Sequence, residues 1–393
     1  MPSTYFRPPA PAHRSRIGIV STYPPQVCGL ATFAAALGGG LARRGHTVEI
    51  VRVRDTPATT PPRQPVVGEI VNGDSRSIHR AAGRLSLCDA VILQHEFGIF
   101  GGDDGAEALD LVGAITAPVI TVLHTVPSLP TPGQLRILTE LCDRSAGVVV
   151  MSETARQRLA AHAAGNVERV VVIPHGAVAA LSSSAPAQAP RSNGEVAPQL
   201  LTWGLIGPGK GIEHAIDALA LLQDMPTPPR YTIAGVTHPK VLATSGDRYR
   251  QLLIERAAAA GLAHTVHFDA TYRDVASLTR FIGSAALVVL PYDSHDQVTS
   301  GVLVDSLAAG RPVIATAFPH AMELLPGGAG LVVPHDNPQA LADAIRTVWD
   351  DPMRLEAMGA AARRIAPTLS WSAVARSYSA QVDLCLARQG TAA

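Results

Sequence analysis

Short apolar segments alternate with amphipathic stretches along most of this 393-residue chain, and this pattern constrains the fold more than any other feature. Continuously apolar strands separated by helices are typical of parallel sheets that are covered on both faces. The alternation stops in a stretch rich in Ala, Ser and Pro and then starts again. The predicted strands are 16–23, 46–53, 89–96, 118–124, 147–152 and 168–176 before that stretch, and 199–206, 230–235, 265–270, 286–292, 312–316 and 330–334 after it. The sequence therefore predicts an α/β protein with two successive, doubly wound Rossmann-like halves.

The length of the chain also favours two domains, because a single hydrophobic core rarely grows beyond ~250–300 residues. Ligands of doubly wound sheets bind beyond the carboxyl ends of the strands, so we expect a binding cleft where the two halves face each other. The expected boundaries are a disordered N-terminal tail at 1–14, a first Rossmann-like domain at 15–177, a linker at 178–198 and a second Rossmann-like domain at 199–369.

Composition argues against several classes of protein. Basic and acidic residues balance at 32 each and aromatic residues make up 4% of the chain, so neither a basic field nor stacking platforms for nucleic acid are expected. The four cysteines form no CxxC pair, which speaks against a zinc site or a disulfide framework and fits a reducing compartment. The N-terminal residues show no secretory signal, and no apolar run reaches the ~18 residues of a membrane span. We expect a soluble, cytoplasmic protein.

The segment from Gly207 to Gly211, with the sequence GPGKG, lies between a predicted strand and a predicted helix and is the sharpest candidate for ligand binding. Glycines let a ligand approach the backbone closely, and the first turn of a helix offers free N–H donors to a phosphate. Lys210 is one of only two lysines among 32 basic residues, which favours a functional ammonium over a solvated turn residue. The stretch nearly matches a P-loop, but Gly211 stands where that pattern needs a Ser or Thr hydroxyl for magnesium. An NTPase is therefore not expected.

Two histidines end predicted strands of the first half, His95 in QHEFG and His124 in VLHTVP. Parallel strands present such residues at the ligand-facing edge of the sheet, so both are candidates for ligand contact and His124 is the stronger one. His175 also ends a strand, in VIPHG, where a packing role beside the linker is favoured.

Together these motifs resemble glycosyltransferase family 4. The segments PPQVCGLATF, VLHTVP, VIPHG, WGLIGPGKGIEHAIDAL, TSGVLVDSLAAGRPVIAT and GLVVPHDNPQALADAI occur in the order seen in that family, and the resemblance runs from Arg16 to Tyr378. It implies the GT-B fold, in which an N-terminal acceptor domain and a C-terminal donor domain face each other across a cleft. The segment SWSAVARSY resembles the family's terminal helix, which implies a helix at 370–388 that crosses back to the N-terminal domain.

The resemblance implies a retaining transfer of a hexose from GDP-mannose or a UDP-sugar to an unidentified sugar, lipid or metabolite acceptor. Gly29 and Lys210 would bind the donor diphosphate, together with a turn formed by Ser300, Gly301 and Val302. A departing nucleoside diphosphate gains negative charge, and a lysine, backbone amides and a helix dipole stabilise that charge without a metal. No cofactor is expected, and the acceptor would be bound by loops of the first half at 54–80 and 97–105.

The resemblance also assigns roles to single side chains. It implies catalytic roles for His124, which would contact the sugar near its reacting carbon, and for Gln297. Asp305 would bind the ribose, and Glu323 and His95 would contact the donor sugar or a loop.

Three positions depart from the family pattern. Leu205 replaces an arginine that would add a cation at the phosphates, and the usual pair of glutamates separated by seven residues is replaced by Gln297 and Asp305. An amide cannot act as a carboxylate nucleophile, so double displacement through Gln297 is excluded and a same-face substitution is favoured, in which the leaving phosphate helps to deprotonate the acceptor. Asp293 and Asp296 have no partner cluster in the sequence, so no metal site is expected.

Two other classes stay open. A nucleotide-sugar 2-epimerase shares the fold, and release of free nucleoside diphosphate only in the presence of an acceptor would favour transfer over epimerisation. A sugar-nucleotide-binding relative without activity is the non-enzymatic alternative. The expected partners are a nucleotide-sugar donor and a glycan, lipid or small-molecule acceptor, with no nucleic acid. A peripheral position at the inner membrane face is the alternative to a purely cytoplasmic location.

Overall fold

The computed structural model describes residues 14–26, 28–57, 63–162, 165–177, 200–271 and 273–390. Residues 1–13 of the expected tail and the expected linker at 178–198 lie outside the described residues. The chain divides into two compact units, each with one sheet. Among the described residues, the first unit comprises those up to Met151, those within Ala155–Ile173 and those from Val374 onward, and the second comprises Ser152–Thr154 and those within Pro174–Ala373.

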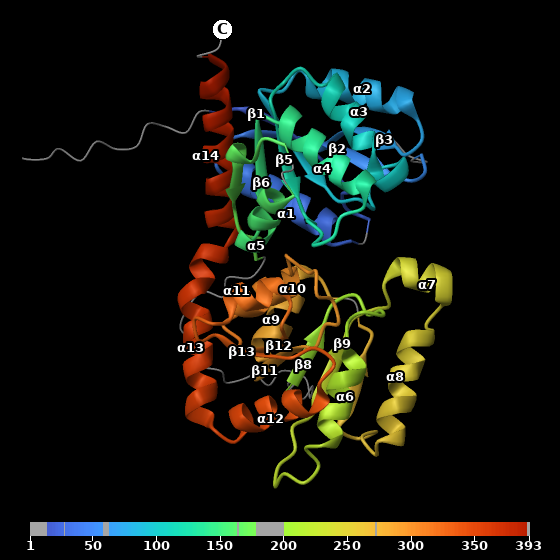
Figure 1. The fold of residues 1–393 in the computed structure, drawn as a ribbon, viewed down its shortest axis with the longest axis vertical. Helices are drawn as coiled ribbons and strands as arrows, with labels where there is room; N and C mark the ends of the chain where they lie inside the picture. Colours follow the sequence, from blue (N-terminus) through green and yellow to red (C-terminus); the bar gives the residue numbers. More distant parts are fainter. Residues whose placement is uncertain are drawn as a thin grey trace, which may run out of the picture. The chain divides into compact units, whose positions relative to one another are not determined.

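The first unit is a parallel sheet with the strand order β3-β2-β1-β4-β5-β6-β7 among its described residues (Figure 1). Its strands are β1 (Arg16–Ser21), β2 (Thr47–Arg54), β3 (Val66–Val71), β4 (Ala90–His95), β5 (Val119–Leu123), β6 (Gly147–Val150) and β7 (Val170–Val172). Its helices are α1 (Gly29–Arg43), α2 (Ser75–Leu85), α3 (Glu107–Ala114), α4 (Pro132–Arg144), α5 (Glu153–Ala161) and α14 (Trp371–Gly390), the last two beginning with residues grouped with the second unit.

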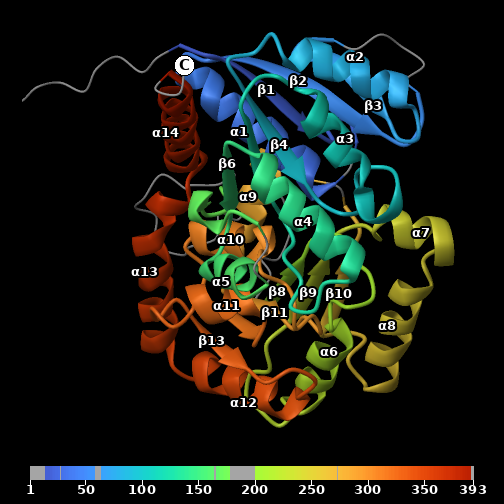
Figure 2. The ribbon, with the colours of Figure 1, turned by 45° about the horizontal axis from the view of Figure 1, so that its top comes forward.

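Helices cover both faces of this sheet. The strand order runs outward from β1 in one direction and from β4 in the other, and right-handed crossovers then place the connecting helices on opposite faces. The helices α2, α3 and α4 lie side by side along one face, as Figure 1 and Figure 2 show, whereas α1 packs on β1 and β2. The central strands β1 and β4 are almost entirely buried, which explains their continuous apolar sequences.

The second unit repeats this plan with the strand order β10-β9-β8-β11-β12-β13 among the described residues. Its strands are β8 (Leu200–Trp203), β9 (Tyr231–Ala234), β10 (Val266–Asp269), β11 (Leu287–Leu290), β12 (Val313–Thr316) and β13 (Gly330–Val333). Its helices are α6 (Ile212–Ala220), α7 (Pro239–Ser245), α8 (Arg248–Ala259), α9 (Val275–Ser284), α10 (Gly301–Ala308), α11 (Pro319–Leu324), α12 (Pro338–Trp349) and α13 (Pro352–Leu369). The doubly wound α/β architecture predicted for both halves is confirmed.

Alternate residues of β11 show how one strand serves two cores. Leu287 and Val289 pack with α6 and α12, whereas Val288 and Leu290 pack with α10. The period of two along a strand sends successive side chains to opposite faces. Both faces are apolar here, so the strand sequence shows no alternation of apolar and polar residues.

One expected loop contains regular structure. The region 54–80 includes β3 and the first turns of α2, which the sequence analysis missed. Gly68 and Glu69 interrupt the apolar run of β3, so the segment lacks the pattern of a buried strand. It lies at the edge of the sheet, where Glu69 forms ion pairs with Arg52 and Arg54 of β2.

The boundary expected at 177 also differs from the division into units. Residues 174–177 group with the second unit, because Ala177 forms a bridge with Ser370 and Gly176 packs against the ring of Trp371. Within the described residues, no helix has both the length and the apolar character that crossing a membrane requires.

Helix α14 is held in the first unit by a buried hydrogen-bond chain. The backbone N–H of Ser15 donates to Nδ1 of His46 at 3.3 Å, so the opposite ring nitrogen carries the proton and donates to Ser379 Oγ at 2.8 Å. The His46 and Ser379 side chains are 5% and 1% exposed, so water cannot replace either partner.

Replacing Ser379 by Ala should therefore lower the free energy of unfolding by about 1–3 kcal/mol, because the buried His46 N–H is left without an acceptor. Urea denaturation of the full chain measures this loss. Ser372→Ala, which removes an exposed hydroxyl from the same helix, is the matched control. A Ser379→Ala transition that coincides with that of the control would contradict the role of this hydrogen bond.

Candidate functional site

The GPGKG loop lies at the topological switch point of the second sheet. Strands β8 and β11 are the neighbouring central strands from which the strand order runs in opposite directions. The loop that contains Lys210 joins β8 to α6, and the loop 291–300 joins β11 to α10. Doubly wound sheets bind ligands outside the carboxyl ends of the strands at such a point. These two loops therefore form the candidate site of the second unit.

Gly211 is required by a close contact between these two loops. It has a left-handed backbone with φ of 57°, and a Cβ atom there would lie 1.8 Å from the carbonyl oxygen of Pro291. The N–H of Asp293 donates to the carbonyl of Gly209 at 3.2 Å, which fastens the loops a second time. No serine or threonine of a P-loop fits at position 211.

The Lys210 side chain lies over an aromatic ring. Its ammonium is 4.3 Å from the ring centroid of Tyr292, a distance typical of a cation–π contact. No carboxylate in the described part of the chain forms an ion pair with Lys210. Its positive charge is therefore held in place by a ring rather than neutralised, which suits an anion-binding group.

The N-terminus of α10 lies at the same edge of the sheet and holds the predicted turn Ser300-Gly301-Val302. Ser300 is the N-cap, and its Oγ accepts from the N–H of Leu303 at 3.3 Å. The N–H of Ser300 itself donates to Nδ1 of His320 at 2.9 Å. Ser300 is thus occupied by internal hydrogen bonds, so an anion at this turn would be bound by the N–H groups of Gly301 and Val302.

Two buried histidines that the sequence analysis did not connect to this turn support it. Burial lowers the pKa of His320 to about 3 and that of His175 to about 4, so both rings are neutral near pH 7. His175 lies against Gly301, where an added Cβ would be 3.2 Å from its Cε1 atom. Neutral rings add no positive charge that would oppose the dipole of α10. Only the tertiary structure brings these histidines to the turn.

The other predicted residues of the second unit are placed as follows. Gln297 lies in the loop before α10, and its amide donates to the carbonyl of Thr299 at 3.2 Å. Asp305 is half-buried in α10. Glu323 in α11 accepts hydrogen bonds from the backbone N–H groups of Glu153 and Thr154 at 2.9 and 2.6 Å, all within the second unit. Glu323 therefore holds a backbone segment in this structure.

A cavity of about 160 Å³ opens beside the start of the same loop. Trp203, Leu205 and Gly235 line it, together with Arg273. Arg273 is fixed by an ion pair with Asp269 at 2.5 Å. Leu205, which stands where the resemblance implies an arginine, thus adds an apolar wall to a cavity. The sequence analysis missed this cavity because its walls come from three different loops.

In the first unit, His124 directly follows β5 and is fixed by a buried partner. Its Nε2 lies 2.7 Å from Oε1 of Gln94, and its ring meets that of Phe33 edge-on with the centroids 4.9 Å apart. Gln94 is fully buried in β4 and was not predicted as a site residue. It accepts the proton of Nε2 and so orients the imidazole.

His95 and Gly29 differ in accessibility. The His95 side chain is 0% exposed and packs against Phe97 and Phe100, and burial lowers its pKa to about 4. Neither ring nitrogen of His95 has a hydrogen-bond partner among the described residues, and its contact with the donor sugar or a loop stays a prediction. Gly29 is exposed in the first turn of α1, and open space surrounds the position of a Cβ atom there.

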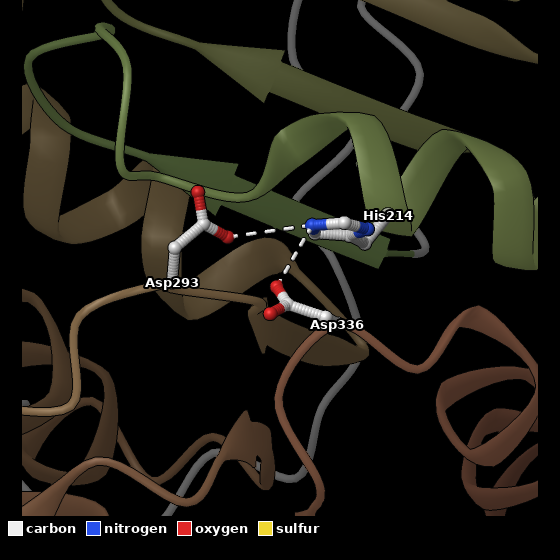
Figure 3. Close-up of side chains that lie close together, drawn as sticks. All are labelled: His214, Asp293 and Asp336. Atoms are coloured by element: carbon white, nitrogen blue, oxygen red, sulfur yellow. Dashed lines mark ion pairs between the residues drawn. The ribbon is translucent and has the colours of Figure 1, made fainter.

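The structure also corrects the expectation that Asp293 has no partner cluster. His214 Nε2 lies 3.5 Å from Oδ1 of Asp293 and 3.2 Å from Oδ1 of Asp336 (Figure 3). The three residues come from α6 and from the loops after β11 and β13, more than 40 residues apart in sequence at the closest. Burial raises the pKa of Asp293, and nearby Glu213 and Asp336 raise it further.

Comparison with known sequences agrees with this geometry. Residues 27–180 match the sequence profile of Glycosyltransferase Family 4, and residues 188–365 match that of the Glycosyl transferases group 1. The chain is 28% identical over 400 residues to a D-inositol 3-phosphate glycosyltransferase of Kineococcus radiotolerans, covering 89% of this chain and 88% of that protein. A protein of the same name from Paenarthrobacter aurescens is 25% identical, with coverage of 88% and 90%.

Solved structures share the fold. The Anabaena protein HepE in complex with UDP has a TM-score of 0.74 at 18% identity, covering 94% of this chain and 99% of that chain. A sucrose-phosphate synthase from Thermosynechococcus elongatus has a TM-score of 0.73 at 19% identity, with coverage of 96% and 100%. Both family profiles, the full-length relatives and the paired parallel sheets lead to one conclusion: the chain is a glycosyltransferase of family 4 with the GT-B fold.

Proposed function

We propose that this glycosyltransferase moves a hexose from a nucleoside diphosphate sugar to a hydroxyl acceptor with retention of configuration. The observation that carries the proposal is the Lys210 ammonium, which has no carboxylate partner among the described residues and lies on a loop at the switch point. The N-terminus of α10 begins at the same sheet edge. A lysine and a helix N-terminus together favour a diphosphate over a neutral ligand.

The cavity beside Leu205 suits the nucleoside end of such a donor. The cavity adjoins the loop that contains Lys210. A ligand with its base in the cavity and its phosphates at Lys210 would therefore contact a single loop. Asp305 in α10 is proposed to accept hydrogen bonds from the ribose hydroxyls. GDP-mannose and UDP-sugars are the donors to test first. The UDP in the HepE structure favours a UDP-sugar.

In this proposal, catalysis comes from stabilising the negative charge of the leaving diphosphate. As the glycosidic bond to the phosphate breaks, charge grows on the diphosphate, and Lys210 and the N–H groups of Gly301 and Val302 stabilise that charge. Gln297 presents an amide, so it can bind a sugar hydroxyl and cannot become glycosylated as a carboxylate would. We therefore propose a same-face substitution. Donor binding in this mechanism needs no cofactor and no metal. Gly29 is proposed to add a backbone N–H to the phosphates.

The acceptor is proposed from the relatives. Two full-length relatives are named D-inositol 3-phosphate glycosyltransferases, which makes an inositol phosphate the first acceptor to assay for this chain. Glycans and lipid-linked sugars are the comparison set. The edge of the first sheet that carries β3 is proposed to contribute to acceptor choice, since it lies in the region 54–80.

Lys210→Ala should weaken binding of a nucleoside diphosphate by roughly 10- to 150-fold, which corresponds to the ~1.5–3 kcal/mol of a charge-assisted contact. Binding of the bare nucleoside should stay nearly unchanged, because the ammonium contacts only the phosphates. Isothermal titration calorimetry measures both. Lys240→Ala removes the other lysine, which is exposed in α7, and is the matched control. Equal losses of affinity for the nucleoside and for the diphosphate would show that Lys210 does not bind the diphosphate.

His124→Ala should lower turnover by ~10²-fold or more while nucleotide affinity stays within a few-fold, because the proposed contact with the sugar strengthens in the transition state. Steady-state kinetics, calorimetry and a melting curve are needed on the same protein. His79→Ala, at an exposed histidine of α2, is the control. If His124 only shapes the turn after β5, the melting temperature will fall while turnover per folded molecule is preserved, and that result would refute the catalytic role.

A further inference from the structure

The cluster formed by His214, Asp293 and Asp336 has the composition and spacing of a metal site. Each residue offers one ligand atom, and these three atoms lie within 4.8 Å of one another (Figure 3). The distances from His214 Nε2 to the two carboxylate oxygens are 3.5 and 3.2 Å. Ligand atoms around a tetrahedral Zn²⁺ are separated by roughly 3.3–3.6 Å, because each lies ~2.0–2.2 Å from the ion. The two separations from His214 are close to these values.

A second feature of the cluster also favours a cation. Oδ1 of Asp293, the atom that faces His214, is shielded from solvent and accepts no hydrogen bond from any described residue. Two carboxylates and the nearby Glu213 concentrate negative charge around it. A buried carboxylate oxygen without a donor costs free energy, and a bound cation would remove that cost.

A further histidine, His335, lies beside the cluster. Nδ1 of His335 donates a hydrogen bond to the carbonyl of Tyr292 at 2.9 Å. Nε2 of the same ring is shielded from solvent and has no partner among the described residues. His335 directly precedes Asp336 in sequence, and its electrostatic effect lowers the pKa of Asp293.

We propose that His214, Asp293 and Asp336 bind one divalent transition-metal ion of the Zn²⁺ or Co²⁺ class. One imidazole with two carboxylates suits such an ion better than Mg²⁺, which prefers six oxygen ligands and keeps its waters. Asp336 is 65% exposed, so the ion has an entry path from solvent. A water would complete the four ligands.

The ion would brace the loop that carries Lys210. His214 lies in the first turn of α6, directly after that loop, and Asp293 is bonded to Gly209 through its backbone. Bound metal would tie this loop to the loops after β11 and β13. The transfer step proposed above uses no metal, and the site stands on its own geometry whether or not the donor binds at Lys210.

The test is metal binding by the full-length protein after treatment with a chelator and desalting. Calorimetry with Zn²⁺ should show one ion per chain, Zn²⁺ should raise the melting temperature, and Co²⁺ should give the visible absorption of a tetrahedral complex. Millimolar Mg²⁺ should not displace the ion. His214→Gln and Asp336→Gly should each weaken Zn²⁺ binding at least ~10-fold.

Two variants keep the test decisive. Asp336 has φ of 50°, a left-handed conformation that glycine adopts without strain, so Asp336→Gly should leave the metal-free protein folded. His295→Gln alters the exposed histidine that lies 4.0 Å from the ring of His335, and it should leave Zn²⁺ affinity unchanged. Absence of binding, or binding lost in His295→Gln and kept in Asp336→Gly, would overturn the proposal.

Discussion

The contact between Gly211 and the carbonyl of Pro291 is the constraint on which the candidate site of the second unit depends. A Cβ atom at position 211 would lie 1.8 Å from that oxygen, so only glycine allows the two loops to meet. The contact brings the loop after β8 against the loop after β11 at the switch point of the sheet. Lys210 reaches the ring of Tyr292 and Asp293 reaches His214 because the two loops are joined there. Candidate ligand-binding residues from distant parts of the sequence are thus positioned by one backbone contact.

Charge is distributed unevenly around this anchor. Lys210 is held by an aromatic ring, whereas Glu213, Asp293 and Asp336 lie on the α6 side of the loop. The arginine that family 4 usually places at position 205 is a leucine in the wall of a cavity. In the proposed donor site, one lysine and the backbone amides at the start of α10 are therefore the groups that would bind a diphosphate. Ser300 gives its own N–H to His320, which leaves the amides of Gly301 and Val302 as the donors of that turn.

Much of the fold could be predicted from the sequence because buried parallel strands have continuous apolar sequences. β3 was missed because Gly68 and Glu69 interrupt such a run at the sheet edge. The position of Lys210 between a strand and a helix could be predicted from local sequence alone. His320, Gln94 and the His214 cluster could not, since their partners are brought to them only by tertiary structure. His95 satisfied the rule for strand ends, yet its ring turned out to be enclosed by two phenylalanines.

We propose that the second unit binds a nucleoside diphosphate without a metal ion. The most direct measurement is the melting temperature of the full chain in chelator-containing buffer with UDP, GDP, uridine or guanosine. A ligand at 100 times its dissociation constant stabilises the folded state by ~2.7 kcal/mol, which such a melting curve detects. At least one of the two diphosphates should raise the melting temperature well above the effect of its nucleoside. No shift with either diphosphate, or a shift that appears only when Mg²⁺ replaces the chelator, would contradict this proposal.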